Sequence, residues 1–241
     1  MIDTHAHLNE IEDIHEAILR AREVGLKGIV AVGMDLLSNQ RTLDLASEFP
    51  EMVHPAIGYH PWSINQETKE QNLKFIEKNL ADCIALGEVG IDYKTKVKKP
   101  LQWEIFSKLL SIASRYNRPV IVHSRFSHQR SHQMVKDAGI EKAVFHWYSG
   151  PLEILTKIID QGYYVSATPA LAYSPPHQTA IIAAPLERIL VETDSPVEYQ
   201  GRISEPAHLM ITLKELSRLK KIPFEDVQFI TYNNAKLFFG I

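Results

Sequence analysis

The sequence predicts an α/β protein whose eight strands close into a (β/α)8 barrel. Short apolar runs of β-favouring residues alternate with helical patterns along all 241 residues, which is typical of a parallel sheet. Eight strand–helix units in a chain of this length match a TIM barrel. The alternative is an open doubly wound sheet, whose usual G-x-G-x-x-G after the first strand is missing here.

The expected strands are short and almost wholly apolar, which suits parallel strands that are buried on both faces. The run GIVAVG at Gly28–Gly33 shows this pattern most clearly. In chain order, the eight strands are expected at Ile2–His7, Gly28–Gly33, Met52–Tyr59, Cys83–Ile91, Val120–Ser124, Ala143–Trp147, Tyr163–Ala167 and Ile189–Thr193.

After each strand, apolar residues recur every three or four positions, which gives a helix one apolar face. Ile14, Ala17, Ile18 and Ala21 form such a face, and Gly25 ends the first helix. The later helices are expected at Leu36–Phe49, Thr68–Leu80, Leu101–Tyr116, Ser131–Ala138, Leu152–Asp160, His177–Ala184, Pro206–Leu219 and Phe224–Phe238. No linker or low-complexity segment divides the chain, so residues 1–241 are expected to form one domain.

The composition argues against several classes of protein. A net charge of −3 and a pI of about 6.4 argue against a strongly basic surface that coats DNA, although a local nucleic-acid groove remains compatible. The single cysteine, Cys83, permits no intrachain disulfide, and the N-terminus lacks a secretory pattern. No apolar run approaches the roughly 20 residues of a membrane span. We therefore expect a cytoplasmic protein with no membrane partner, and the composition is compatible with a monomer.

The first predicted strand ends in two histidines, His5 and His7. Residues two apart on a strand point to the same side, so both imidazoles can reach one metal ion. Burying two imidazoles in an apolar strand is costly unless they find partners. Their pairing at a strand end favours metal ligation, and the alternative is a pair of hydrogen-bonded core histidines.

The fourth predicted strand carries a carboxylate, Glu88, between Gly87 and Gly90. A buried carboxylate must be paired with a positive charge or coordinate a cation, and both interpretations are open for Glu88. Glycines beside it allow another group to approach closely. Asp92 lies nearer the following loop, where it is expected to act as a turn or capping residue.

Titratable residues end five of the predicted strands, and the active site of such a barrel lies at the carboxyl ends of its strands. Together these residues favour a centre with two cations, held by mixed nitrogen and oxygen ligands that suit Zn²⁺ or Mn²⁺, or Mg²⁺ with retained waters. Cys83 begins its strand at the opposite end of the barrel. The six expected ligands are His5, His7, Glu88, His123, His146 and Asp194.

At these residues the chain resembles the TatD family of metal-dependent hydrolases, within the amidohydrolase-like metallo-barrels. The matching motifs are IDTHAHL, IGYHPW, LGEVGIDY, PVIVHSR, FHWYSG, VETDSP and EPAHL. Members of this family resemble phosphodiesterases that act on DNA, often as 3′→5′ exonucleases. The resemblance therefore implies a deoxyribonuclease that takes DNA ends, single strands or another phosphodiester.

The resemblance also implies a role for each site residue. The metal ligands it implies are His5, His7 and Asp194 for the first metal, His123 and His146 for the second, and Glu88 as the bridge. The substrate-binding residues it implies are His60, which would face the substrate, and Arg125 and Arg202, which would lie near phosphate. Asp194 would also bind the nucleophilic water.

Three features depart from the family pattern, and all concern the substrate rather than the ligands. Asn9 stands where many members have Asp, and Trp147–Gly150 replaces the common Cys-Phe-Ser-Gly. The loop after Tyr93 is rich in lysine; it either holds a nucleic-acid backbone or is a solvated loop. The aromatic residues that could stack on bases, or pack against the barrel rim instead, are Trp62, Trp147 and Tyr148.

Two cations lower the pKa of a bound water, and Asp194 would orient that nucleophile and take its proton. The same centre could attack a carbonyl, so an amide, lactone or ester hydrolase is the first alternative, including one that removes a misplaced acyl group from tRNA. A non-catalytic barrel is the second, and the complete ligand set argues against it. Arg125 and Arg202 favour a phosphate-bearing substrate because their planar forks suit phosphate oxygens.

The remaining histidines are expected to have no part in the site. His15, His177 and His208 are interpreted as surface residues, and His54 as structural. His128 and His132 are four residues apart on a predicted helix, where a solvated face is favoured over chelation of a metal by the pair.

Overall fold

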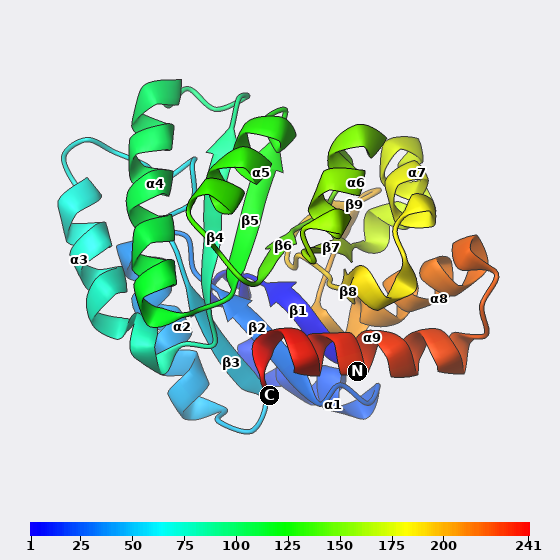
Figure 1. Ribbon diagram of the computed structural model, residues 1–241. Helices are drawn as coiled ribbons and strands as arrows, with labels where there is room; N and C mark the ends of the chain where they lie inside the picture. Colours follow the sequence, from blue (N-terminus) through cyan, green and yellow to red (C-terminus); the bar gives the residue numbers. More distant parts are fainter.

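The computed structural model describes residues 1–241 and contains eight parallel strands, hydrogen-bonded in chain order from β1 to β8 (Figure 1). Each strand therefore pairs with the next one along the chain, and β8 returns to β1. This is the predicted barrel. The strands are β1 (Ile2–Ala6), β2 (Gly28–Val32), β3 (Val53–Ile57), β4 (Ala85–Asp92), β5 (Val120–Arg125), β6 (Ala143–Phe145), β7 (Tyr164–Ala167) and β8 (Ile189–Val191).

Backbone hydrogen bonds close the seam between β1 and β8 at the carboxyl ends of the two strands. Ala6 forms a parallel bridge with Ser195, and the His7 amide donates to the Ser195 carbonyl at 2.7 Å. The Asp194 amide donates to the His5 carbonyl at 2.9 Å. The segment that completes the barrel therefore also brings the end of β1 to the residues that follow β8.

Helices surround the sheet and cover one end of it. The last helix, α9, crosses the amino-terminal end of the barrel beside the two chain termini (Figure 1). No helix of the protein combines the length and apolar character needed to cross a membrane. The helices are α1 (Ile14–Glu23), α2 (Leu36–Glu48), α3 (Lys69–Asn79), α4 (Lys99–Tyr116), α5 (His128–Asp137), α6 (Leu152–Asp160), α7 (Pro175–Ala183), α8 (Leu209–Lys220) and α9 (Phe224–Phe239).

Two apolar clusters form the core. The larger one contains 52 buried residues and includes the apolar faces of the surrounding helices. The smaller one includes Val30, Ala85 and Leu190 of the strands, and Phe238 and Phe239 of α9 pack onto it. The amino-terminal end is therefore closed by apolar side chains, which leaves the carboxyl ends of the strands for polar groups.

Element boundaries differ from the predictions by a few residues. β4 continues through Asp92, whereas β6 and β8 end at Phe145 and Val191, before the polar residues that follow them. α5 begins at His128, three residues before the predicted start. Soon after β6 and β8 the backbone leaves the extended conformation, since Trp147 and Asp194 have φ angles of 43° and 51°.

A short hairpin after β8 was not predicted. It pairs β9 (Glu198–Tyr199) with β10 (Arg202–Ile203), and its two turn residues, Gln200 and Gly201, have φ angles of 52° and 83°. Two positive φ angles in succession suit a two-residue hairpin turn. Strands of two residues are too short to show the alternation by which strands are recognised in a sequence.

Candidate metal centre

His5 and His7 at the end of β1 face two carboxylates at the barrel mouth. Their Nε2 atoms lie 3.2 Å apart. Asp194 Oδ1 lies 3.4 Å from His5 Nε2 and 3.5 Å from His7 Nε2. Glu88 Oε2 lies 3.5 Å from each of the same two nitrogens. Two imidazoles and two carboxylates thus converge on one point, and all four side chains are buried.

The spacing of these four atoms fits a metal ion. Four ligands about 2.1 Å from one cation in tetrahedral geometry lie about 3.4 Å from each other. The separations above, from 3.2 to 3.5 Å, are close to this value. Ordinary hydrogen bonds between the same groups would be shorter, near 2.8 Å. The spacing of these four side chains is therefore compatible with a bound cation.

A second group of histidines surrounds the other oxygen of Glu88. Oε1 lies 2.7 Å from His123 Nδ1, 3.4 Å from His146 Nε2 and 3.5 Å from His60 Nε2. Glu88 therefore stands between two imidazole clusters, with one oxygen toward each. This placement is compatible with a bridging carboxylate, and the bridging role that the resemblance implied stays a prediction.

The glycines near Glu88 serve the backbone rather than a ligand. Gly58, after β3, packs against the backbone of Glu88, where a Cβ would come within 2.5 Å of the Glu88 nitrogen. Gly90 has a φ of 150°, and a Cβ there would overlap the carbonyl of His123. Close approach was expected at Gly87 and Gly90. At Gly90 the approaching group is the backbone of the neighbouring strand, and a Cβ at Gly87 would come within 2.6 Å of the Ile121 side chain.

Hydrogen bonds on the far side of three imidazoles leave a lone pair facing the centre. His7 Nδ1 donates to the Val32 carbonyl at 3.1 Å, so Nε2 can ligate. His146 Nδ1 donates to Glu192 Oε1 at 2.8 Å, which leaves its Nε2. His123 is reversed: its Nε2 lies 3.2 Å from Asp92 Oδ2, which leaves Nδ1 toward Glu88.

His60 is arranged differently from the other imidazoles of the centre. The Trp62 amide donates to His60 Nδ1 at 3.2 Å, so the neutral ring carries its proton on Nε2. Burial lowers the pKa of His60 to about 4, which keeps the ring neutral. Its Nε2–H therefore points into the centre as a hydrogen-bond donor, in keeping with the substrate-facing role that the resemblance implied.

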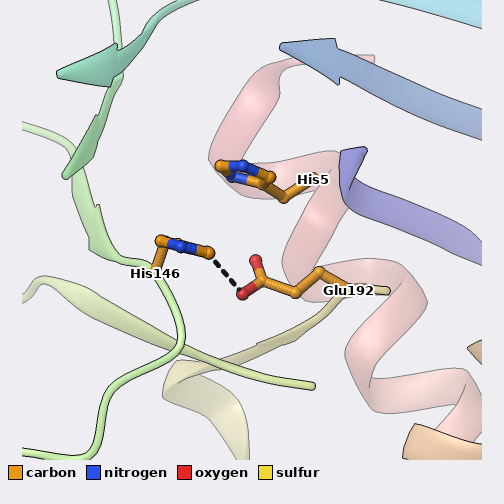
Figure 2. Close-up of side chains that lie close together, drawn as sticks. All are labelled: His5, His146 and Glu192. Carbon is orange, nitrogen blue, oxygen red and sulfur yellow. Dashed lines mark hydrogen bonds and ion pairs between the residues drawn. The ribbon is translucent and has the colours of Figure 1, made fainter. Parts of the chain in front are cut away.

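Glu192 has a position that the sequence did not define beyond its place at a strand end. Its Oε1 accepts from His146 Nδ1, from the Trp147 amide at 3.0 Å and from Ser166 Oγ at 2.7 Å. Figure 2 shows the carboxylate beside the His146 ring, joined to it by the dashed line, with the His5 ring above. The two rings are nearly parallel, and their centroids lie 4.2 Å apart. The close spacing of Glu192 and Asp194 in the ETDSP motif was the only signal available for this carboxylate.

Asp92 is more than the turn residue that was expected. It does accept from the Lys94 amide at 2.6 Å, as a turn residue would. It is also fully buried and accepts from the Trp62 indole at 2.6 Å, besides its contact with His123. Asp92 therefore holds His123 from behind, as Glu192 holds His146.

The ionisable groups of the centre shift one another's pKa values in opposite directions. Burial by itself would raise the pKa of Glu88 and Asp194, but neighbouring imidazoles, His146 among them, lower both. Burial would lower the pKa of His146, but the carboxylates of Glu192 and Glu88 raise it to about 10. Anionic carboxylates and imidazoles whose protons a cation can replace form a donor set that fits a divalent metal.

The two arginines lie outside this cluster, on its rim. Arg202 is exposed in β10, and its Nη2 donates to His208 Nε2 at 2.8 Å. Arg125 is exposed at the end of β5, two residues after His123. Neither guanidinium contacts the six expected ligands in this structure, and a role with phosphate stays a prediction for both.

Two histidines were placed wrongly by the sequence patterns. His177 is fully buried: its Nδ1 donates to the Tyr148 carbonyl at 2.8 Å and its Nε2 accepts from the Thr168 amide at 3.1 Å. His132 is also buried rather than on a solvated face. Neighbouring helices pack against α5 and α7, so His132 and His177 face the interior.

The aromatic residues proposed for stacking divide into two groups. Tyr148 is fully buried and its hydroxyl donates to the Pro151 carbonyl at 2.8 Å, so it packs within the fold. Trp147 is half-buried against Tyr199. Trp62 is 55% exposed beside His60, and it is the one of the three whose ring is open to a substrate.

The sequence pattern that defines the TatD related DNase family matches residues 2–240. The chain belongs to this family. A metal-dependent hydrolase of Methanocaldococcus jannaschii is 30% identical over 99% of this chain and 96% of its own length. Deoxyribonuclease TATDN3 of Homo sapiens is 28% identical over 99% of this chain and 94% of its own length.

Solved structures of other proteins share the fold over nearly the whole chain. The TatD homolog YJJV of Escherichia coli superposes with a TM-score of 0.91 and 25% identity, covering 100% of this chain and 98% of that one. A phosphotriesterase homology protein of Escherichia coli, solved with phosphate in its active site, has a TM-score of 0.74 and 16% identity, covering 99% of this chain and 98% of that one. The predicted family and barrel fold are thereby confirmed.

Proposed function

We propose that this TatD-family protein is a phosphodiesterase that hydrolyses DNA with two divalent cations bound at the barrel mouth. The observation that carries the proposal is the position of Glu88, with Oε2 facing His5 and His7, and Oε1 facing His123 and His146. The proposed ligands of the first cation are His5, His7, Asp194 and Glu88, and those of the second are His123, His146 and Glu88.

Bound divalent cations would lower the pKa of a shared water and stabilise the charge that develops on the phosphate. The chain supplies the other groups that the reaction needs. Asp194 would orient the water and accept its proton, since its carboxylate is buried beside His5 and His7. His60 would donate from Nε2 to a phosphate oxygen, because its other nitrogen already accepts from Trp62.

DNA is the substrate class that the relatives support best. The family description and the human relative both name a deoxyribonuclease. The exposed guanidinium groups of Arg125 and Arg202 on the rim suit phosphate oxygens. A local cationic rim is compatible with the net charge of −3. Phosphate binding depends on the charge of the surface around the site, not on the total charge of the protein.

Activity measurements on the purified chain would test this proposal. After chelation, the protein would be supplied with Mn²⁺, Mg²⁺ or Zn²⁺ and assayed on single-stranded DNA, RNA, a small phosphodiester and a carboxylic ester. We expect metal-dependent cleavage of DNA and of the small phosphodiester. Hydrolysis of the carboxylic ester without either phosphodiester would contradict the proposal and favour an acyl hydrolase.

A variant of the proposed base sharpens the same test. Asp194→Asn should abolish turnover, at least about a thousandfold, while the protein stays folded and binds much of its metal. Asp160→Asn, an exposed aspartate at the end of α6, is the matched control and should turn over like wild type. Wild-type rates in Asp194→Asn would remove Asp194 from the role of base.

A further inference from the structure

Trp62 connects the exposed rim of the barrel with the proposed second metal site. It is 55% exposed in the loop after β3, yet its indole N–H donates to the fully buried Asp92 at 2.6 Å. The oxygen that accepts this bond, Asp92 Oδ2, also lies 3.2 Å from His123 Nε2. A single carboxylate oxygen therefore contacts the indole on one side and a proposed metal ligand on the other.

The indole restricts how the Asp92 carboxylate can turn. The other oxygen, Oδ1, accepts from the Lys94 amide at 2.6 Å, so each oxygen has a donor besides His123. Hydrogen bonds from an N–H to a carboxylate are roughly twice as strong as those between neutral groups. Rotation of the Asp92 carboxylate away from His123 would break both bonds, and the indole therefore helps to fix the oxygen that His123 contacts.

His123 depends on this support more than the other proposed ligands do. Its side chain is 12% exposed, whereas the side chains of the other five are between 0% and 8% exposed. Packing therefore confines the His123 ring least. A hydrogen bond on the far nitrogen fixes the orientation of a ligating imidazole. The contact with Asp92 thus determines whether His123 Nδ1 faces Glu88, which it approaches to 2.7 Å.

The carboxylate behind His146 is held in a different way. Glu192 accepts from the hydroxyl of Ser166, which is fully buried, whereas Asp92 accepts from a side chain at the rim. An indole N–H requires a protein partner when it is buried, but water can hydrate one at the rim. The bond from Trp62 to Asp92 is therefore explained by its effect on the carboxylate rather than by a need of the indole.

We propose that Trp62 is a positioning residue whose indole N–H, through Asp92, holds His123 in the orientation that binds the second cation. This inference rests on the proposed two-cation centre and adds to it a residue that is not itself a ligand. Loss of the indole N–H should weaken the binding of the second cation. The first cation, with its ligands His5, His7 and Asp194, should be bound as in the wild-type protein.

Trp62→Phe tests the inference because the variant retains most of what surrounds His60. Phenylalanine keeps an aromatic ring beside His60, and the backbone amide that donates to His60 Nδ1 remains. The chelated protein would be titrated with Zn²⁺ in competition with a chromogenic chelator. We expect one of two equivalents to bind about tenfold more weakly than in the wild-type protein, and the other to keep its affinity.

Trp103→Phe is the matched control, because the Trp103 indole N–H has no hydrogen-bond partner and the residue lies on α4, away from the proposed ligands. It should leave both affinities unchanged. Wild-type affinities for both equivalents in Trp62→Phe would overturn the inference. Equal weakening of the two equivalents would also overturn it, since the effect would then not be specific to the site of His123.

A double-mutant cycle shows whether Trp62 acts through Asp92. Asp92→Ala alone should weaken the same equivalent by about tenfold or more, and adding Trp62→Phe should cause no further loss. Independent effects that add up in the double variant would contradict action through Asp92.

Nuclear magnetic resonance of the chelated protein tests the hydrogen bond without any metal. The Trp62 Nε1–H should exchange slowly with solvent although the ring is exposed, and faster in Asp92→Ala. Exchange as fast as that of a free indole in the wild-type protein would overturn the inference. A wild-type protein that binds fewer than two cations would contradict the proposed centre itself. Two bound cations with unaltered affinities in Trp62→Phe would leave that centre intact and overturn only the role of Trp62.

Discussion

The backbone amide of Asp194 donates to the carbonyl oxygen of His5 at 2.9 Å, across the seam where the barrel closes. Asp194 takes a φ of 51°, a conformation that aspartate tolerates better than most residues. That backbone turn places its carboxylate beside both histidines of β1. The same backbone contact therefore closes the barrel and brings the Asp194 carboxylate to His5 and His7, the other proposed ligands of the first cation.

The first prediction concerns Glu192, which holds His146 from behind. Glu192→Ala removes the acceptor of the His146 Nδ1–H, of the Trp147 amide and of Ser166. Because such partners fix the tautomer and orientation of a ligand, metal affinity should fall about 10- to 100-fold. Glu192→Gln keeps an acceptor oxygen and should lose less. Competition with a chromogenic chelator measures both, and wild-type affinity in Glu192→Ala would contradict the assignment.

The second prediction separates His60 from the ligands around it. His60→Ala should keep the full metal content, since the Trp62 amide leaves its Nε2 protonated. It should lower kcat by about 10²-fold through the loss of a hydrogen-bond donor to the phosphate. Elemental analysis of the purified variant, beside its turnover, distinguishes the two roles. Loss of one metal equivalent would show that His60 is a ligand.

The third prediction concerns how stability depends on pH through His177, the buried histidine that contacts the loops after β6 and β7. Burial lowers the pKa of His177 to about 4, below its ordinary 6.5, so the unfolded chain binds the extra proton first as pH falls. Its contribution to stability is therefore complete above pH 6.5 and is lost as the pH falls toward 4. Over that window it amounts to about 3 kcal/mol.

Urea unfolding across this pH range, compared with His177→Gln, measures that contribution. The variant should be less stable than wild type at neutral pH, because glutamine cannot reproduce both hydrogen bonds of the ring. The difference between the two proteins should shrink between pH 6.5 and 4. A difference that stays constant across the window would show that His177 is not buried in its neutral form.

Much of the barrel could be predicted because its strands and helices follow from the pattern of neighbouring residues in the chain. Apolar runs and three-to-four spacing mark strands and helices, and parallel strands in chain order bring their ends to one rim. Five strand ends with titratable groups therefore predicted that His5, Glu88 and Asp194 would lie close together, as they do in the structure. The short hairpin around Gln200 escaped detection because two-residue strands have no period.

The supporting groups of the site could not be predicted in the same way. Which nitrogen of His123 or His146 faces the centre depends on the carboxylate behind it. These carboxylates come from other parts of the barrel, since Asp92 ends β4 and Glu192 directly follows β8. Asp92 and Glu192 are 31 and 46 residues away from their partners in the chain. His177 was mistaken for a surface residue because its burial depends on contacts with Tyr148 and Thr168, in the loops after β6 and β7. The spacing of residues within its own helix gives no sign of these contacts.

The most direct test is to count the metal ions bound per chain and to measure whether they are magnetically coupled. The chelated protein would be titrated with Mn²⁺ and followed by elemental analysis and electron paramagnetic resonance. We predict about two equivalents per chain with an exchange-coupled signal, and loss of the coupling in Glu88→Gln, where the bridge is weakened. A single equivalent at saturation, or two uncoupled ions in the wild-type protein, would contradict a centre bridged by Glu88.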